Sequence, residues 1–167
     1  MNSTIFITGA GGNLGRAVAN AFAERGANLV LVDLQREALQ NSFGASDERR
    51  ELAAANLLDQ VEVDATVNKA LERFGRIDVL CNIAGAFRMG PPVHETKDAD
   101  WNFLFDVNAR TVLHTARAVV PGMLKAGGGK IINVGAYAAQ KGVAGMGAYI
   151  ASKSAVIRIT ETIAGEL

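Results

Sequence analysis

The chain is poor in the features that mark several large classes of protein. Only one of its 167 residues is cysteine, which excludes an internal disulfide, and only three are proline. Its 17 Lys and Arg residues balance 17 Asp and Glu residues, and its longest basic run is Arg49-Arg50. A chain without net positive charge or a basic cluster lacks the electrostatic footprint of nucleic-acid binding, so we expect no nucleic-acid partner.

Long apolar stretches are also missing. No run approaches the roughly 20 apolar residues that span a bilayer. The first residues carry neither the basic nor the long apolar region of a secretory signal. We therefore expect no membrane insertion and a cytoplasmic location. The single Cys81 agrees with this location, because cytoplasmic proteins rarely contain disulfides. His94 and His114 have no metal-ligand spacing with each other or with Cys81, so no metal site is expected.

What the sequence does contain is typical of one globular α/β domain. Hydrophobic residues make up 49% of the chain, and 18 glycines provide tight turns. Short β-branched runs alternate with segments of helical period, the pattern of a parallel sheet covered by helices on both faces. The expected strands are Thr4–Thr8, Asn28–Asp33, Glu51–Ala55, Ile77–Asn82 and Lys130–Gly135. The pattern predicts a doubly wound parallel sheet of at least five strands in three α/β/α layers, within a single domain over residues 1–167.

The helical segments lie between these strands. We expect helices from about Leu14, over Arg36–Asn41, over Gln60–Phe74, over Asp98–Lys125 with a bend near Pro121, and from about Tyr149 onward. With the strand order 3-2-1-4-5, the fifth strand is an exposed apolar edge. From that edge we expect that the working protein continues with at least one more strand, so that the domain is incomplete at its C-terminus.

A glycine-rich turn joins the first strand to the first helix, where the chain reads TGAGGNLG over Thr8–Gly15. Gly9, Gly12 and Gly15 let the backbone approach a pyrophosphate closely, and the N–H groups at the start of a helix attract its negative charge. In this strand-turn-helix context, the turn predicts a Rossmann-type dinucleotide site.

Asp33 ends the second strand, about 20 residues after the glycines, where a carboxylate accepts hydrogen bonds from the adenine-ribose hydroxyls. The same carboxylate repels a 2′-phosphate. No arginine lies in the glycine turn and the nearest one downstream is Arg36, so NAD is favoured over NADP. The alternative is that Asp33 only caps the following helix.

Tyr149 and Lys153 lie four residues apart at the start of a predicted helix, and hence on one face of it. A phenol is a poor base at neutral pH, but a neighbouring cation favours its ionised form. The pair is therefore suited to proton transfer. The alternative is an ordinary solvated helix face.

Together with CNIAG at Cys81–Gly85 and DVN at Asp106–Asn108, these motifs resemble the short-chain dehydrogenase/reductase family in order and spacing over Thr4–Leu167. The resemblance implies that Tyr149 is the general acid/base, that Lys153 holds the nicotinamide ribose, and that Asn108 holds a water in a proton relay. The cofactor contacts that it implies are Gly9, Gly12, Asn13, Leu14, Gly15, Asp33, Asn56, Leu57, Asn82, Ala84, Gly85, Tyr149 and Lys153.

The sequence departs from the family pattern most seriously at Ala136, where relatives carry a serine that binds the substrate oxygen. Losing such a donor costs on the order of 3 kcal/mol in the transition state. A branch resembling dihydropteridine reductase also has alanine there and reduces a substrate that needs little polarisation. Two lesser departures are Asn13 in place of a glycine and Ile83 in place of an asparagine.

Two functions follow from this pattern. The first is an NAD(H)-dependent oxidoreductase that transfers hydride between nicotinamide and a small carbonyl, alcohol or imine-type substrate. The alternative is a non-catalytic dinucleotide-binding protein, a pseudoenzyme or sensor, which Ala136 favours. The resemblance also implies a homodimer or homotetramer formed through the helices from about Asp98 and Tyr149.

Overall fold

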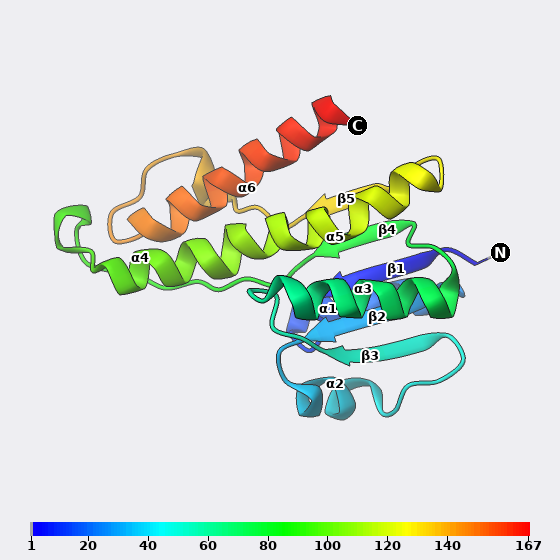
Figure 1. Cartoon of the computed structure of the whole chain (residues 1–167). Helices are drawn as coiled ribbons and strands as arrows, with labels where there is room; N and C mark the ends of the chain where they lie inside the picture. Colours follow the sequence, from blue (N-terminus) through cyan, green and yellow to red (C-terminus); the bar gives the residue numbers. More distant parts are fainter. Residues whose placement is uncertain (1) are drawn as a thin grey trace. The chain divides into compact units, whose positions relative to one another are not determined.

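The computed structural model describes residues 2–167, which form two compact units (Figure 1). The sheet unit contains the residues up to Ala84 together with His114–Ile132, and the helix unit contains Gly85–Leu113 and Asn133–Leu167.

The sheet unit is built on five strands that lie side by side in the order β3-β2-β1-β4-β5 (Figure 1). They are β1 (Thr4–Thr8), β2 (Asn28–Asp33), β3 (Arg50–Ala54), β4 (Val79–Asn82) and β5 (Lys130–Asn133). β1 pairs in parallel with β2 and β4, and β2 pairs in parallel with β3. The predicted strand order is confirmed.

Helices cover both faces of this sheet. They are α1 (Asn13–Ala23), α2 (Arg36–Phe43), α3 (Gln60–Phe74) and α5 (Thr111–Lys125). Side chains of β1 alternate between the faces, as a period of two residues requires. Ile5 and Ile7 pack in one cluster with residues of α1 and α2, whereas Phe6 packs in another with residues of α3 and α5. The predicted three-layer α/β/α arrangement is confirmed.

β5 forms the outer edge of the sheet, as predicted. Ile132 is 49% exposed, while Ile131 packs against the buried cluster around Phe6. One side of this strand is thus covered by protein and the other side carries exposed apolar surface.

The helix unit contains α4 (Asp98–Phe105), a π-helical turn η2 (Asp106–Arg110), the first residues of α5, and α6 (Gly147–Glu166). Two short 3-10 turns, η1 (Val93–Glu95) and η3 (Tyr137–Gln140), complete it. Its small core joins Ala109 and Val112 to Val156 of α6.

The structure corrects several predicted boundaries. The single helix predicted over Asp98–Lys125 is divided by η2, where the Thr111 N–H bonds the carbonyl of Asp106 five residues earlier. A π turn adds one residue to a helical turn, and apolar periodicity did not reveal it. Pro121 lies inside α5, which continues to Lys125.

Three strands and the last helix also have shifted ends. β3 begins one residue earlier and ends one residue earlier than predicted, β4 begins at Val79 and β5 ends at Asn133. The next carbonyl after β5, that of Val134, accepts a hydrogen bond from the Lys153 ammonium instead of continuing a strand. α6 begins at Gly147, two residues before the predicted start. None of the helices within residues 2–167 combines the length and apolar character needed to cross a membrane.

Candidate active site

The glycine turn of the sheet unit is packed so tightly that it has no room for side chains at two positions. Gly9 has a φ of 64°, and a Cβ there would lie 2.8 Å from backbone atoms of Ala84. A Cβ on Gly15 would lie 2.2 Å from the carbonyl oxygen of Gly9. The turn therefore packs against the backbone that follows β4, and the start of α1 packs against the turn itself.

The first turn of α1 carries no side-chain cap among the described residues. Gly12 is its N-cap, and the first turn contains no acidic residue. The first N–H groups of a helix have no partner within the helix. They are donors of the kind that bind a phosphate group. Asn13 and Leu14 are exposed at this end, and Asn13 accepts a hydrogen bond from Arg16.

Asp33 holds the glycine turn onto the end of β2. Its Oδ2 accepts a hydrogen bond from the Gly11 N–H at 2.9 Å, and its Oδ1 accepts one from the Leu34 N–H at 2.8 Å. The N-cap of α2 is Gln35, so Asp33 does not cap that helix and this alternative is wrong. Gly11, which sequence reasoning did not single out, leaves space for the contact, because a Cβ there would lie 3.1 Å from Asp33 Oδ2.

The turn after β4 is tied to β1 by a residue that sequence reasoning also missed. The hydroxyl of Thr8 accepts hydrogen bonds from the N–H groups of Ile83 at 3.0 Å and Ala84 at 3.1 Å. Asn82 is buried, and its Oδ1 accepts a 2.8 Å hydrogen bond from the hydroxyl of Thr115 in α5. Thr8 is the first residue of the glycine-rich motif and Thr115 belongs to no motif, but the sequence assigned neither side chain a role, and only the fold reveals their contacts.

Asn56 and Leu57 follow β3 and differ in exposure. Asn56 is exposed and its Oδ1 accepts a hydrogen bond from the Leu58 N–H, whereas the side chain of Leu57 lies in the core. The carbonyl of Leu57 accepts a 2.9 Å hydrogen bond from Nδ1 of His114. His114 therefore has a structural contact.

Asn108 lies in the π turn of the helix unit and is 1% exposed. Its Oδ1 accepts a hydrogen bond from the Ala86 N–H at 2.9 Å, and its Nδ2 donates to the Ala86 carbonyl at 3.0 Å. The Nδ2 also donates to the hydroxyl of Ser152 at 3.1 Å. One carboxamide thus joins the loop after Gly85 to α6.

Tyr149 and Lys153 both lie on α6, as predicted. Tyr149 is half-buried, and its ring meets the ring of Phe87 edge-on at a centroid distance of 4.9 Å. Lys153 is 5% exposed and donates a 2.8 Å hydrogen bond to the carbonyl of Val134. Burial lowers the pKa of the Lys153 ammonium below its ordinary value.

Gly85 marks the point where these side chains converge. A Cβ on Gly85 would lie 2.7 Å from Oδ1 of Asn108 and 3.3 Å from Nζ of Lys153. The structure therefore brings together three predicted site residues that are far apart in the sequence. The buried carboxamide and the ammonium lie on either side of Gly85, and the phenol of Tyr149 belongs to the preceding turn of α6. Side chains of these types can hold and move a proton.

Ala136 lies between β5 and η3, of which it is the N-cap. It lines a cavity of about 490 Å³ in the helix unit, together with Gly135, Tyr137 and residues of α6 such as Ile157. A methyl group offers no hydrogen-bond donor, so this position cannot polarise a substrate oxygen.

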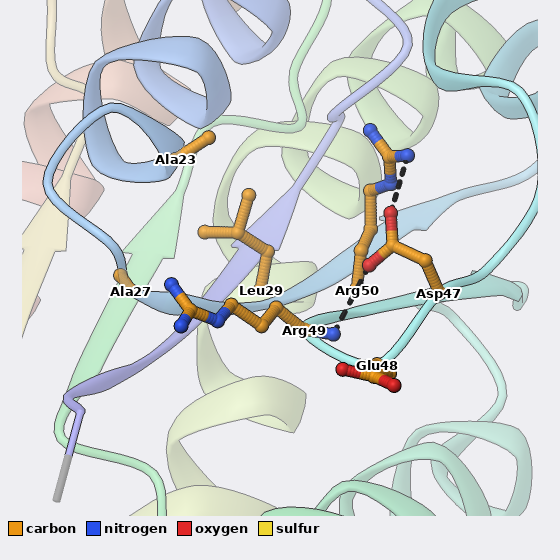
Figure 2. A pocket seen from close by; sticks show the side chains of 7 residues that line it. All are labelled: Ala23, Ala27, Leu29, Asp47, Glu48, Arg49 and Arg50. Atoms are coloured by element: carbon orange, nitrogen blue, oxygen red, sulfur yellow. Dashed lines mark hydrogen bonds and ion pairs between the residues drawn. The ribbon is translucent and has the colours of Figure 1, made fainter.

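A second cavity, of about 410 Å³, lies in the sheet unit, with Arg50 paired to Asp47 on its wall (Figure 2). It is lined by Ala23, Ala27, Leu29 and residues 47–50. These residues lie where β2 and β3 begin, whereas the glycine turn follows the end of β1. Because the strands are parallel, this cavity lies at the amino ends of the strands, whereas the glycine turn lies at their carboxyl ends. Among residues 2–167, no group of three His, Cys, Asp or Glu side chains could hold a metal ion.

Known proteins that resemble this chain in sequence and in structure are short-chain dehydrogenases. The family profile described as short chain dehydrogenase matches residues 3–167. The sorbitol dehydrogenase of Cereibacter sphaeroides is 35% identical over 95% of this chain and 62% of its own length. A solved short-chain dehydrogenase/reductase from Burkholderia phymatum in complex with NAD is 34% identical, with a TM-score of 0.92 over 99% of this chain and 60% of that one.

An NAD+-bound xylitol dehydrogenase structure is 32% identical, with a TM-score of 0.91 over 98% of this chain and 64% of that one. The chain thus spans less than two thirds of the length of each of these three relatives.

Proposed function

Because the chain belongs to the short-chain dehydrogenase family, we propose that the protein is an NAD(H)-dependent oxidoreductase. It transfers hydride between nicotinamide and a small carbonyl or alcohol substrate. The observation that carries this proposal is the convergence of Asn108 and Lys153 on Gly85, on the unit that also contains Tyr149. A purely structural cluster has no need of a buried ammonium, which burial penalises.

The sheet unit supports the proposed binding of the adenine half of NAD. The glycine turn leaves no space for a Cβ at Gly9 or Gly15, and the uncapped start of α1 suits a pyrophosphate. We propose that Asp33 accepts the adenine-ribose hydroxyls and disfavours the 2′-phosphate of NADP. The other proposed cofactor contacts of this unit are Gly12, Asn13, Leu14, Asn56, Leu57, Asn82 and Ala84. We further propose that residues 1–167 belong to one dinucleotide-binding domain.

The helix unit supports the proposed proton transfer. The nicotinamide supplies or accepts the hydride, and Tyr149 exchanges a proton with the substrate oxygen. Lys153 uses one of its three N–H donors on the carbonyl of Val134. We propose that the other two serve a ribose hydroxyl and the phenol of Tyr149. Gly85 keeps the approach to Lys153 open. Both N–H groups of Asn108 are engaged, so its Oδ1 is the atom that we propose to hold a relay water.

The substrate class is proposed from the relatives and from Ala136. Three relatives are named for their action on polyols, namely sorbitol, D-threitol and galactitol. We propose a small alcohol of this type, with its ketone as product, as the first substrate to test. Ala136 also favours a substrate that needs little polarisation, such as an imine.

The decisive experiment measures NADH formation from NAD+ with sorbitol, D-threitol, galactitol and xylitol. We expect activity with at least one of these alcohols, abolished by Tyr149→Phe, while NAD+ binding measured by calorimetry is retained. The alternative function is that of a non-catalytic NAD-binding protein. Ala136 favours this alternative because its side chain has no donor for a substrate oxygen. NAD+ binding without turnover of any alcohol or imine would support this alternative.

We also propose that the protein forms a homodimer or homotetramer through α4 and α6. Trp101 and Phe103 of α4 are each 40% exposed, and Leu113 of α5 is 46% exposed. Apolar side chains at the surface of a helix are typical of an interface. Sedimentation velocity measures the assembly directly, and a monomer at all concentrations would contradict this proposal. The cytoplasmic location stays a prediction.

A further inference from the structure

Ser152 lies between Tyr149 and Lys153 on α6 and is fully buried. Its hydroxyl accepts a hydrogen bond from Asn108 Nδ2 at 3.1 Å and donates one to the carbonyl oxygen of Tyr149 at 2.8 Å. The direction of both bonds is fixed, because an amide N–H only donates and a carbonyl only accepts. Ser152 therefore connects the Asn108 carboxamide to the backbone of Tyr149 in a single orientation.

The orientation of Asn108 is itself fixed by Ala86. The Ala86 N–H requires an acceptor and its carbonyl requires a donor, so exchanging Oδ1 and Nδ2 of Asn108 would break both contacts. The remaining N–H of Nδ2 then points to Ser152. Phe87, the neighbour of Ala86, packs edge-on against the Tyr149 ring. Tyr149 is thus held at its backbone by Ser152 and at its ring by Phe87.

Serine hydroxyls in helices often bond a carbonyl three or four residues earlier, without any wider consequence. The additional bond from Asn108 distinguishes Ser152 from such a serine, because it comes from another segment, a π turn, and reaches the turn of helix that carries Tyr149. Ser154, two residues further on, provides the contrast. Its hydroxyl donates to the carbonyl of Ala139 at 3.0 Å, and among the described residues the hydrogen bonds of Asn108 go to Ala86 and Ser152 and not to Ser154.

Resting on the proposed function, we propose that Ser152 is a positioning residue for proton transfer. It transmits the fixed orientation of Asn108 to the first turns of α6, so that the phenol of Tyr149 and the ammonium of Lys153 keep their mutual geometry. Ser152 touches no reacting atom. Its loss therefore affects the rate of the chemical step more than the binding of either substrate.

The test uses Ser152→Ala in the full-length protein, with NAD+ and the alcohols sorbitol, D-threitol, galactitol and xylitol. We expect kcat to fall about tenfold, since a buried hydrogen bond of this kind contributes a factor of that order. KM for the alcohol and Kd for NAD+ should change less than about twofold. Ser154→Ala is the matched control, with kcat equal to that of the wild type.

A double-mutant cycle tests whether the effect passes through Asn108. In an Asn108→Ala background the further change Ser152→Ala should lower kcat by less than about twofold, since the contact is already broken. Hydrogen exchange at the Ala86 amide gives a readout that does not depend on turnover. We expect this exchange to be faster in Ser152→Ala than in Ser154→Ala.

The outcomes separate the inference from the proposed function. An active wild type whose kcat is unchanged by Ser152→Ala overturns the inference and leaves the proposed function standing. Losses of kcat and NAD+ affinity in equal proportion indicate a general loosening of the fold and also overturn it. A wild type that forms no NADH from any of the alcohols contradicts the proposed function, and the inference falls with it.

Discussion

Replacing Gly15 by alanine tests whether the glycine turn is as closely packed as its geometry indicates. The added Cβ would lie 2.2 Å from the Gly9 carbonyl oxygen and 2.7 Å from Cα of Ala10, and both atoms belong to the backbone. No side-chain rotation relieves such a contact, so the turn and the start of α1 must move apart. Overpacking of this kind costs about 2 kcal/mol or more. For a chain of this size, that lowers Tm by about 6 °C.

Gly12→Ala is the matched control within the same turn, because its Cβ would lie 3.4 Å from the Gly9 carbonyl oxygen, an ordinary contact. Alanine is a poorer N-cap than glycine, so we expect Gly12→Ala to lower the free energy of unfolding by about 0.5 kcal/mol, well below the loss in Gly15→Ala. Chemical denaturation followed by circular dichroism measures both variants. Calorimetry with NAD+ should show an affinity about tenfold lower for Gly15→Ala. Equal stability and equal affinity of Gly15→Ala and the wild type would refute the reasoning.

Three further predictions concern buried ionisable groups. Burial lowers the pKa of Lys153 below the ordinary value of 10.5 that it has in the unfolded chain. At a pH between the lowered pKa and 10.5, the unfolded chain therefore binds more protons than the folded one, and the free energy of unfolding should rise with pH there. In Lys153→Met this contribution should vanish from the denaturation profile. Glu51 in β3 has a 6% exposed side chain that is hydrogen-bonded to the partly exposed Lys69 and Arg73, so Glu51→Gln should cost about 2 kcal/mol of unfolding free energy. The exposed pair of Glu161 with Arg158 makes Glu161→Gln the control, with a loss below about 0.5 kcal/mol. Burial raises the pKa of Cys81 to about 11, and mass spectrometry should find its thiol unmodified by iodoacetamide near neutral pH until the protein unfolds.

Much of the fold could be predicted because apolar runs mark strands such as β1 and β2. The continuous apolar run of β2 indicated a strand covered on both faces, and its side chains from Leu29 to Val32 are buried. The glycine turn was predictable for a similar reason, since only glycine fits where backbone segments approach as closely as Gly15 and Gly9 do. In both cases a local sequence pattern has a direct steric cause.

The contacts around the candidate site could be predicted only in part. Tyr149 and Lys153 were identified by their spacing, but nothing in the sequence indicated that Ser152 joins Asn108 to the backbone of Tyr149. That contact depends on the π turn, which shifts Asn108 by one residue relative to a regular helix. Apolar periodicity does not reveal a single extra residue, because the apolar residues before the π turn and those after it each keep a regular helical spacing.

The π turn has a consequence for how the chain tolerates length changes. Each residue of an α-helix rotates the following segment by about 100°, so the extra residue between Asp106 and Arg110 sets the angular offset between the faces of α4 and of the start of α5. Deleting one residue there would convert the segment into a continuous α-helix and rotate the side that carries Trp101 away from its present direction. The carboxamide of Asn108 would then point to a different side of the helix. A one-residue deletion at this point should therefore be far more damaging than one in an exposed loop such as that around Gly142, even though it would make the helix more regular.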